Sequence, residues 1–335
     1  MRAGATLLPS GRMDPNPRQK VPPLPTFFVV GTGRCGTTLL QSMLMSHPDV
    51  RIPPETQFFD HLDPVRFGLP DPLPDEAVEE YLRRARAGRG ALFLDAVPGT
   101  GDAYAGAVRA GLRDAASQFA WVCERLSAGQ SGGVLGEKTP QHWRYLDRIL
   151  RVAPQAKVIH LCRDPRDVVS GLMEMDWWHG RSVRRTAGHW RRTLTEALAW
   201  DARLGPARHR IVRYEDLVAD PASVLFDLTG MLGIPFDPAM LAFQEAAERA
   251  FRPDEASYKG MTRGALDRTR TGRYRTRLTP LEIRVVESTV GRGLMDRLGY
   301  APDPDVRRPR WSVLDPAVAR IADSLRSGHG SRPRG

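Results

Sequence analysis

The feature that most constrains the fold of this chain is a glycine-rich segment, Gly31–Thr38, which reads Gly-Thr-Gly-Arg-Cys-Gly-Thr-Thr. It follows a short apolar run of strand-forming residues, Phe27–Val30. Apolar residues then recur at the spacing of a helix, at Leu39, Leu40, Met43 and Leu44. A loop between a strand and a helix directs backbone N–H groups and the helix N-terminus towards one point, where they bind an anion. The sequence therefore predicts a phosphate-binding loop.

The same strand-then-helix pattern returns twice further along the chain. Val158–Cys162 and Ile211–Tyr214 are apolar enough for buried strands, and an Asp-Pro pair follows each of them, at 164–165 and at 220–221. Aspartate is a good N-cap and proline is favoured in a first helical turn, so each pair predicts a helix start. Strands that alternate with helices predict an α/β fold, a P-loop-like three-layer arrangement with a central, mostly parallel sheet flanked by helices. Weaker signals predict a strand at 133–135 and helices at 75–88, 102–128 and 141–151.

The chain of 335 residues is long enough for one large α/β domain, which we expect to span residues 26–302. Residues 1–25 are rich in proline, arginine and glycine and lack periodicity, so they predict a flexible N-terminal segment. The net charge is +10, and from Arg263 onwards 16 arginines stand against eight acidic residues. We therefore expect residues 303–335 to form a basic, flexible C-terminal tail.

Composition also limits the compartment and the partners. The three cysteines, Cys35, Cys123 and Cys162, are odd in number and lack metal-ligand spacing, so we expect a reducing compartment without a disulfide framework. No apolar run approaches the ~18 residues that a membrane span needs. The basic residues lack regular aromatic interleaving, so we expect no nucleic-acid partner. These features predict a cytoplasmic protein.

The loop differs from that of ATP-binding proteins at one position. The spacing of Gly31 and Gly36 matches a P-loop, but Thr37 stands where the lysine that reaches the β- and γ-phosphates of ATP is found. A cation is present inside the loop instead, at Arg34. The missing lysine argues against an ordinary Mg·ATP enzyme, whereas the loop, its hydroxyl groups and Arg34 still suit a phosphate.

The strand, the loop, the helix and the following His47-Pro48 together resemble the 5′-phosphosulfate loop of sulfotransferases that use 3′-phosphoadenosine 5′-phosphosulfate (PAPS). In the tyrosylprotein and bacterial branches of that family the basic residue of the loop is an arginine, as Arg34 is here. Further matching elements follow in the family's order as far as about Tyr300. The resemblance implies that the 5′-phosphosulfate is held by Gly33, Arg34, Cys35, Gly36, Thr37 and Thr38.

PAPS also carries a 3′-phosphate, and the segment from Arg163 to Ser170 resembles the family element that binds it. Arg163 ends a predicted strand, where open α/β sheets bind their ligands, and Ser170 returns to roughly the same face of the following helix. The family's serine usually lies one position later, where this chain has Gly171. Either Ser170 replaces that serine after a small rotation, or the contact is lost. A salt bridge at the strand end is the structural alternative for Arg163.

Two further segments resemble family elements that contact the nucleotide. The sequence Arg-Tyr-Glu-Asp-Leu at 213–217 places Tyr214 where the family's tyrosine contacts the adenine, although a core tyrosine fits the same place. Thr-Gly-Arg-Tyr at 271–274 resembles the late segment that closes over the 3′-phosphate, which makes Arg273 a candidate ligand. Other arginines compete for that role, at Arg263, Arg268, Arg270 and Arg275.

The resemblance also implies a catalytic pair. Glu55 lies where tyrosylprotein-type sulfotransferases place the glutamate that removes the acceptor's proton. Lys138, one of four lysines in the chain, lies in a loop similar to one that carries a lysine near the sulfate. A capping acid and an ion pair with Glu137 are the respective structural alternatives. The cytosolic branch uses a histidine base, but His47 fits a turn and His142 a helix face, so we assign both a structural role.

We therefore predict a sulfotransferase that moves a sulfuryl group from PAPS to a hydroxyl or amine by in-line displacement, with Glu55, Arg34 and Lys138 as catalytic residues. We expect no metal, and PAP as the product. A P-loop-type nucleotide or small-molecule kinase, and a non-catalytic protein that binds PAP or a polyanion, are the alternatives. The acceptor stays open among a carbohydrate, a secondary metabolite, a lipid and a peptide. Its pocket is expected within residues 57–130 and 174–205, where Trp177, Trp178 and Trp190 either line it or lie in the core.

Overall fold

The computed structural model describes most of the chain between residues 22 and 306. The described residues are 22–88, 94, 99–130, 132–178, 182–251, 255, 264 and 266–306. Most of the predicted N-terminal segment, and the predicted tail from residue 307 onwards, therefore lie outside the described residues. Asp303, at which we expected the tail to begin, is buried and accepts a hydrogen bond from the Tyr274 hydroxyl at 2.7 Å.

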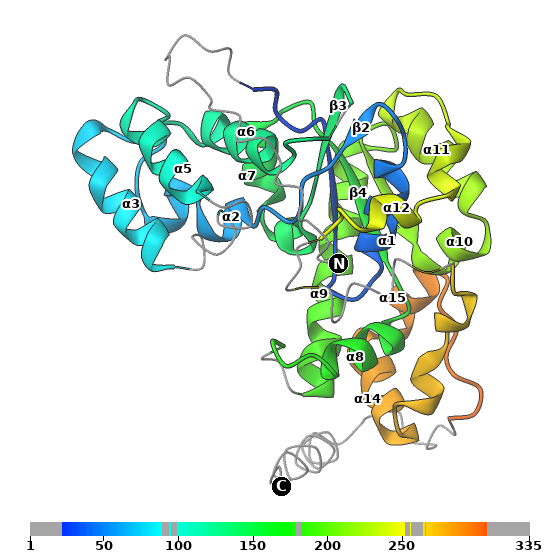
Figure 1. Cartoon of the computed structure of the whole chain (residues 1–335). Coiled ribbons are helices and arrows are strands. Elements are labelled where there is room, and N and C mark those ends of the chain that lie inside the picture. Colours follow the sequence, from blue (N-terminus) through cyan, green and yellow to red (C-terminus); the bar gives the residue numbers. More distant parts are fainter. Residues whose placement is uncertain are drawn as a thin grey trace, which may run out of the picture.

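The centre of the molecule is a sheet of five strands in the order β2-β3-β1-β4-β5, and every neighbouring pair is parallel (Figure 1). This arrangement confirms the predicted α/β class. The third predicted strand ends one residue early, because Tyr214 begins a helix instead of ending β5. The strands are β1 (Phe27–Gly31), β2 (Val50–Arg51), β3 (Val134–Lys138), β4 (Lys157–Cys162) and β5 (His209–Arg213).

Both faces of the sheet are covered, as the apolar sequence of β1 requires. Phe27 and Val29 belong to the core on one face, and Phe28 and Val30 belong to the core on the other, because successive side chains of a strand alternate. The helices that contribute to the first core are α1 (Thr37–Met45), α8 (Pro165–Met173), α9 (Val183–Leu204), α10 (Tyr214–Ala219), α11 (Pro221–Leu232), α12 (Gln244–Ala247), α14 (Pro280–Val290) and α15 (Arg292–Arg297). Those that contribute to the second are α2 (Phe58–His61), α3 (Val78–Ala87), α5 (Thr100–Arg109), α6 (Ala115–Leu126) and α7 (Leu146–Val152).

The Asp-Pro pairs start helices as predicted. The Asp164 side chain accepts from the Arg166 backbone N–H at 2.9 Å at the start of α8, and Asp220 accepts from Ser223 at 3.1 Å at the start of α11. The predicted helix at 141–151 is divided into a 3₁₀ turn, η3 (Pro140–Tyr145), and α7. The predicted helix at 102–128 is likewise two helices, α5 and α6.

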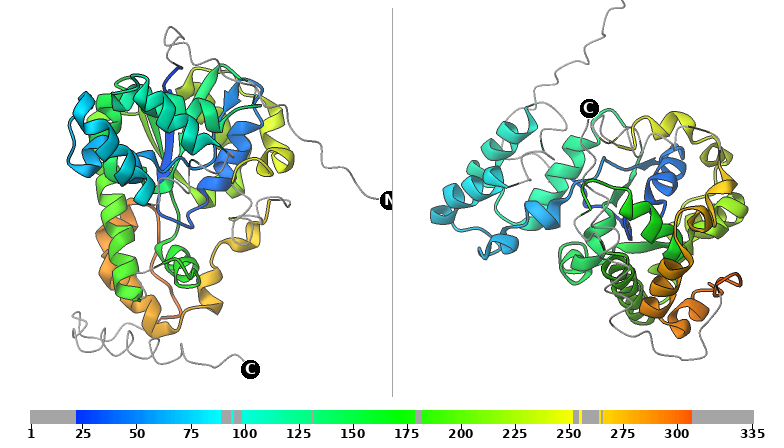
Figure 2. Two further views of the ribbon diagram at one scale, coloured as in Figure 1. Left: turned by 60° about the vertical axis from the view of Figure 1, so that its left-hand side comes forward. Right: turned by 90° about the horizontal axis from the view of Figure 1, so that it is seen from below.

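The elements form a lobe beside the sheet and a group of helices below it. Helices α2, α3 and α5 make up the lobe, and α8 and α14 lie below the strands (Figure 1). Helix α9 is long and runs from this lower group up alongside the sheet (Figure 2). No helix among the described residues is long and apolar enough to cross a membrane.

Candidate active site

Strand topology gathers the predicted site residues at one edge of the sheet. Because the strands are parallel, their carboxyl ends lie together. The loop Gly31–Thr38 leaves β1, Lys138 ends β3, Arg163 follows β4 and Tyr214 follows β5. Segments that are far apart in the sequence are therefore neighbours at this edge.

The loop has the backbone geometry of a tight anion-binding turn. Gly36 is the N-cap of α1 with φ of 101°, and Arg34 adopts φ of 66°, which is uncommon for a residue with a side chain. A β-carbon at Gly36 would lie 2.5 Å from Cδ2 of Tyr214, so the tyrosine ring packs directly against the loop backbone. Strained backbone of this kind is concentrated at functional sites. The glycine is required here both for its conformation and for the close approach of Tyr214.

Within the loop the hydroxyl residues and the cysteine differ in environment. Thr37 is buried and Thr38 is half-buried at the first turn of α1. Cys35 is fully buried, and this burial raises the pKa of its thiol to about 11, against a smaller lowering by a hydrogen bond with Thr32. The thiol is therefore protonated at neutral pH, which fits a small buried filler and not a reactive nucleophile.

Arg163 links three of the predicted elements. Its guanidinium lies 4.4 Å from the centroid of the Tyr214 ring and donates to the backbone carbonyl of Arg34 in the loop at 3.5 Å. It also donates to the backbone carbonyl of Arg270 in the late segment. Among the described residues, the buried Nε of Arg163 has no hydrogen-bond partner. A guanidinium with an unused N–H beside a glycine-rich loop suits a phosphate ligand.

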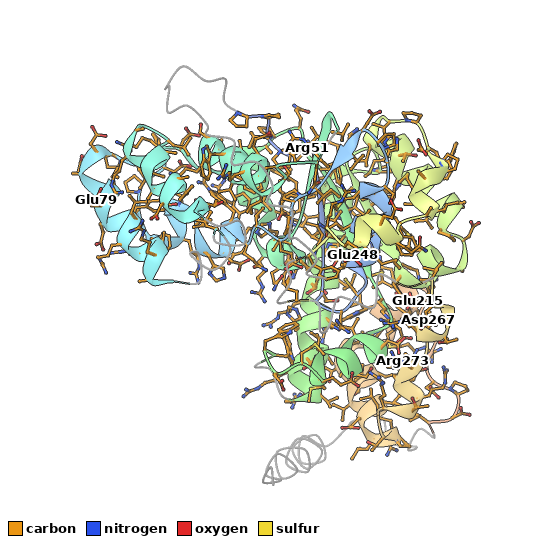
Figure 3. All side chains as sticks on the ribbon, in the orientation of Figure 1. Arg51, Glu79, Glu215, Glu248, Asp267 and Arg273 are labelled. Carbon is orange, nitrogen blue, oxygen red and sulfur yellow. The ribbon has the colours of Figure 1, made fainter. Side chains whose placement is uncertain are left out.

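Asp167 of α8 is hydrogen-bonded to the late segment at 271–274. Its carboxylate accepts from the backbone N–H groups of Gly272 at 2.8 Å and Tyr274 at 2.9 Å, and it contacts Arg163 at 3.3 Å. These bonds hold Arg273, which lies between the two bonded residues, on the Arg163 side of the molecule. Arg273 and Asp267 lie in the same region below the sheet, far from Glu79 in the helical lobe (Figure 3).

Two of the competing arginines have acidic partners of their own. Arg270 contacts Asp267 at 3.1 Å and Arg275 contacts Asp303 at 3.3 Å. The side chain of Arg268 and the whole of Arg263 lie outside the described part of the chain. Among Arg270, Arg273 and Arg275, whose side chains the structure describes, Arg273 therefore stays the candidate for the 3′-phosphate.

The predicted serine and its glycine neighbour face different surroundings. The Ser170 hydroxyl is buried and donates to the backbone carbonyl of Asp167, one helical turn earlier, at 3.0 Å. A β-carbon at Gly171 would instead lie 3.4 Å from Cβ and 3.8 Å from Nε of Arg34. Position 171 is thus the one that faces the loop cation.

Glu55 and Lys138 form a buried ion pair. Nζ of Lys138 lies 2.6 Å from Oε1 of Glu55, with the lysine side chain fully buried and the glutamate side chain 8% exposed. The other carboxylate oxygen of Glu55 accepts from Nε2 of Gln57 at 2.9 Å. Lys138 therefore pairs with Glu55 and not with its sequence neighbour Glu137. A proton acceptor and a cation are adjacent at the edge where the loop lies.

The two histidines that we considered as bases are both tied into the structure. His47 accepts from the backbone N–H of Asp49 at 3.0 Å and its Nε2 lies 2.9 Å from the carbonyl of Pro235, as a turn residue would. His142 is fully buried, with Nδ1 3.0 Å from Glu137. Both contacts agree with the structural role that we assigned.

The three tryptophans of the expected acceptor region have different positions. Trp190 is fully buried in the core, and its indole N–H donates to the backbone carbonyl of Arg163 at 2.9 Å. Trp178 is half-buried and donates to Thr186. Trp177 is 38% exposed, and a β-carbon at Gly33 of the loop would lie 3.5 Å from its ring. Of the three, Trp177 has the exposure that a contact with an acceptor needs.

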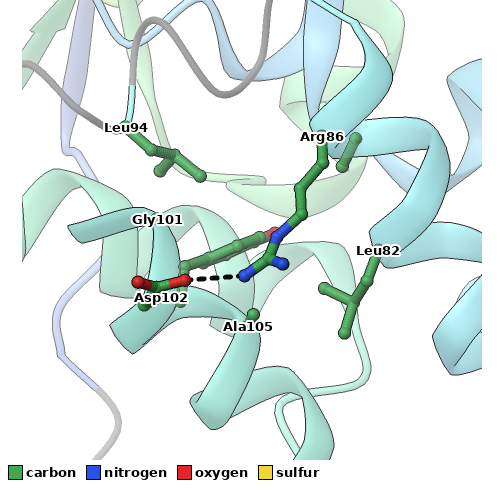
Figure 4. A pocket seen from close by; sticks show the side chains of 8 residues that line it. Leu82, Arg86, Leu94, Gly101, Asp102 and Ala105 are labelled. Carbon is green, nitrogen blue, oxygen red and sulfur yellow. Dashed lines mark hydrogen bonds and ion pairs between the residues drawn. The ribbon is translucent and has the colours of Figure 1, made fainter. Parts of the chain in front are cut away.

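A pocket of about 300 Å³ lies elsewhere, between α3 and α5 in the lobe (Figure 4). An ion pair of 2.7 Å between Arg86 and Asp102 borders it. The eight described residues that line this pocket include none of the predicted site residues. The pocket is therefore separate from the edge of the sheet where the loop, Glu55 and Arg163 lie.

Most of the chain matches a known protein family. A family model described as the sulfotransferase family covers residues 25–238. The chain belongs to the sulfotransferase family. The matched range includes the loop, Glu55, Lys138 and Arg163, whereas Arg273 lies beyond it. The predicted enzyme class is confirmed, and the kinase alternative is set aside.

Relatives with different names match different shares of the chain. The chain is 31% identical to the nodulation protein NoeE of Sinorhizobium fredii, over 84% of this chain and 67% of that protein. It is 24% identical to protein-tyrosine sulfotransferase 1 of Danio rerio, over 88% of this chain and 77% of the relative. It is also 27% identical to carbohydrate sulfotransferase 5 of Mus musculus, over 51% of this chain and 48% of the relative.

Solved structures show the same fold at lower identity. The sulfotransferase domain of the Synechococcus PCC 7002 olefin synthase superposes with a TM-score of 0.55 at 24% identity, over 81% of this chain and 96% of that domain. The sulfotransferase domain of the curacin biosynthetic pathway superposes with a TM-score of 0.56 at 19% identity, over 84% of this chain and 99% of that domain. These likenesses agree with the parallel sheet and flanking helices described above.

Sequence reasoning missed several residues of this sulfotransferase that organise the site. Gln57 bonds to Glu55, and Asp167 joins Arg163 to the late segment. Glu137 accepts from two threonines and contacts His142 behind the Glu55–Lys138 pair. Neither a motif nor a periodicity identifies them, because each also depends on a contact with a distant segment: Gln57 with Thr139, Glu137 with Thr56 and Asp167 with Gly272.

Proposed function

We propose that this sulfotransferase moves the sulfuryl group of PAPS to a hydroxyl or amine acceptor by in-line displacement, with Glu55 as the general base. The observation that carries the proposal is the buried contact of 2.6 Å between Glu55 and Lys138, at the sheet edge that also holds the glycine-rich loop. A carboxylate that can take a proton and a cation that can neutralise a sulfuryl group are the groups that this reaction needs.

The donor site follows from the loop and from Arg163. The backbone N–H groups of the loop, with Thr37 and Thr38, hold the 5′-phosphate at the N-terminus of α1. Arg163 and Arg273 bind the 3′-phosphate, which supplies the anion for the buried Nε of Arg163. Tyr214, stacked between Gly36 and Arg163, contacts the adenine. Ser170 stays a predicted 3′-phosphate ligand, although its hydroxyl is engaged within α8.

Glu55, Lys138 and Arg34 carry the transfer step. In the reaction a bond forms between the acceptor oxygen or nitrogen and sulfur while the bond from sulfur to the bridging oxygen of the donor breaks. Arg34 and Lys138 neutralise the charge that develops on the sulfuryl and bridging oxygens. When Lys138 turns towards that charge, Oε1 of Glu55 is released from the ion pair and takes the proton of the acceptor. The pair therefore couples occupation of the donor site to activation of the base.

The acceptor classes follow from the relatives and from Trp177. The similar proteins include a protein-tyrosine sulfotransferase and a carbohydrate sulfotransferase, so tyrosine peptides and glycosides are the first acceptors to test. The exposed ring of Trp177 beside Gly33 offers an apolar surface for either a phenol or a sugar ring. Secondary metabolites and lipids with a free hydroxyl complete the set of candidate acceptors.

A transfer assay tests the base. Purified protein is incubated with ³⁵S-labelled PAPS and a panel of tyrosine peptides, glycosides, phenols and lipid alcohols. We expect transfer to at least one class, and a loss of roughly 10²- to 10⁴-fold in the Glu55→Gln variant, with PAP binding retained. Glu196→Gln, at an exposed position on α9, is the matched control and is expected to transfer normally.

Two results would change this assignment. Normal turnover by Glu55→Gln would remove Glu55 as the base. Tight PAP binding without transfer to any acceptor class would favour the non-catalytic alternative, in which a sulfotransferase fold binds PAP or a polyanion.

A further inference from the structure

Gln57 has a backbone conformation that its side chain does not favour. It adopts φ of 50° and ψ of 22°, in the left-handed region, at the N-cap of α2. A non-glycine residue in this region is uncommon and persists only where its surroundings fix it. Gln57 is also buried, with 7% of its surface exposed, so its side-chain amide must find hydrogen-bond partners within the protein.

One carboxylate fixes the backbone around Gln57. Oε1 of Glu137 accepts from the hydroxyls of Thr56 at 2.9 Å and Thr139 at 2.6 Å. The Thr139 hydroxyl in turn accepts from the backbone N–H of Gln57 at 3.3 Å. Thr56 is therefore bonded to Glu137 of β3, and the backbone of Gln57 is bonded to Thr139, which directly follows β3.

His142 holds the same carboxylate from the other side. Its Nδ1 lies 3.0 Å from Oε2 of Glu137, and both side chains are fully buried. Burial by itself raises the pKa of Glu137, but the charge and hydrogen bond of His142, with the two hydroxyls, outweigh it and lower the pKa. Burial likewise opposes protonation of His142, and the carboxylate of Glu137 outweighs it and raises that pKa. Each of the two buried groups therefore favours the charged form of the other.

The amide of Gln57 points back at the base. Nε2 donates to Oε2 of Glu55 at 2.9 Å, while Oε1 of Glu55 contacts Lys138 at 2.6 Å. We propose that Gln57 is a positioning residue, held by the Glu137–His142 pair through Thr139, that fixes one oxygen of Glu55 so that the other takes the acceptor's proton. This inference rests on the proposed role of Glu55 and adds a residue that the family resemblance did not supply.

The two contacts give the oxygens of Glu55 different tasks. Oε2 stays bonded to an uncharged amide throughout, so its position does not depend on the donor. Oε1 exchanges the ammonium group of Lys138 for the proton of the acceptor, which leaves Glu55 neutral and the acceptor bonded to sulfur. Among the described residues, Lys138 from β3 contacts this carboxyl and His142 from η3 interacts with it electrostatically, and Glu137 and Asp60 act on the histidine in turn.

The test replaces the amide with a group of the same length. Gln57→Met keeps a β-carbon and an unbranched side chain but cannot donate to Glu55. We expect kcat for transfer to fall roughly 10- to 100-fold with an unchanged Kd for PAP, because a hydrogen bond to a charged group is lost. Loss of that bond also favours the protonated carboxyl, so the titration of Glu55, followed by ¹³C NMR of glutamate-labelled protein, moves to higher pH. The Glu55→Gln protein assigns the resonance.

A matched control separates positioning from stability. Gln118→Met makes the same replacement at a fully buried amide in the helical lobe, where Gln118 accepts from Tyr104 at 2.9 Å. It is expected to lower the melting temperature without moving the Glu55 titration. Thr139→Val, which keeps the shape of threonine but removes the hydroxyl beneath Gln57, is expected to shift the titration in the same direction by a smaller amount.

The test of Gln57 distinguishes failure of its positioning role from failure of Glu55 as the base. An unshifted Glu55 titration in a folded Gln57→Met protein, with unchanged kcat, would overturn the positioning role while leaving Glu55 as the base. Normal transfer by Glu55→Gln would instead overturn the proposed base, whatever Gln57→Met does. The NMR titration needs no acceptor, so the hydrogen bond from Gln57 can be tested before an acceptor is known.

Discussion

The β3 side and the β4 side of the site are held together in different ways. On the β3 side the contacts join buried side chains, from Glu55 to Lys138 and from Glu137 to His142. On the β4 side a guanidinium, Arg163, contacts a tyrosine ring and two backbone carbonyls besides the carboxylate of Asp167. Each arrangement has one buried nitrogen to which no described residue is bonded, Nε2 of His142 in the first and Nε of Arg163 in the second. In the first that nitrogen lies on a side chain already paired with a carboxylate, whereas in the second it belongs to a guanidinium beside the glycine-rich loop.

This difference assigns separate tasks to the two sides. Groups that move protons must be positioned within a fraction of an ångström, and buried side-chain networks provide such positioning. Groups that bind a polyanion must offer cations and backbone N–H groups to a ligand that brings the opposite charge. We therefore expect substitutions on the β3 side to change turnover, and substitutions on the β4 side to change donor affinity.

After Glu55→Gln, the largest effect is expected from Lys138→Met. The variant removes the cation opposite Glu55, and transfer is expected to fall by roughly 10²- to 10³-fold. Because a buried carboxylate loses its partner, the free energy of unfolding is expected to fall by about 3–5 kcal/mol. Steady-state transfer and urea unfolding measure the two effects.

Lys157→Met is the control for this substitution. Lys157 begins β4 and its ammonium group donates to the carbonyl of Met231 at 2.5 Å, away from Glu55. Transfer by this variant is expected to be normal. If Lys138→Met turned over at the wild-type rate, the division of tasks between the two sides would be wrong.

Buried histidines on the two sides are expected to respond to pH in opposite directions. Burial lowers the pKa of His160 on β4 from 6.5 to about 3, and His209 adds to the shift. Below pH 6.5 the unfolded chain takes up a proton that the folded protein does not, so stability falls with pH down to about 3, by about 1.4 kcal/mol per pH unit. The pKa of His142 is raised in the folded protein. The stability that it contributes is therefore fully present below the pKa of the unfolded chain, and it is lost as the pH rises through the pKa of the folded protein.

Replacement of His160 tests its share of the loss of stability at acid pH. His160→Leu is expected to reduce the fall in unfolding free energy between pH 6.5 and pH 4, measured by urea unfolding at several pH values. An identical slope for wild type and His160→Leu would mean that other groups cause the acid destabilisation.

The smallest expected effect concerns the glycine at position 171. A serine there has room for its β-carbon, which would lie 3.4 Å from Cβ of Arg34. Gly171→Ser is expected to lower the Kd for PAP about three- to tenfold, because it adds a hydroxyl donor beside the loop cation. Ser170→Ala is the companion variant. It is expected to raise the Kd for PAP by no more than about threefold, because the hydroxyl of this predicted ligand also bonds to the backbone carbonyl of Asp167. Weaker binding by Gly171→Ser would show that the site has no use for that hydroxyl.

The local signals in the sequence were sufficient for the central part of the fold. Apolar runs predicted β1, β4 and β5, and the two Asp-Pro pairs predicted the starts of α8 and α11. Helix α9 was missed because its buried residues, which include Trp190 and Leu194, form a narrow stripe among several arginines. Strand β2 has two residues, too few to leave a pattern.

The site was predictable where one segment carries the signal, and not where it depends on long-range contacts. The loop and its neighbours Arg163 and Tyr214 were found as motifs, and the structure brings them together. The bond between Gln57 and Thr139 spans 82 residues, and that between Asp167 and Gly272 spans 105. Nothing in either local sequence indicates its partner, so these residues became visible only once the chain was folded.

The most direct test of the account is a calorimetric titration of the chelator-treated protein with PAP and, separately, with ATP and Mg²⁺. We expect tight, metal-independent binding of PAP and weak binding of ATP. We also expect Arg163→Ala to lose far more affinity for PAP than for adenosine 5′-phosphosulfate, which lacks the 3′-phosphate. Binding of ATP·Mg²⁺ without binding of PAP would contradict the proposed donor, and equal losses for both ligands in Arg163→Ala would place the 3′-phosphate elsewhere.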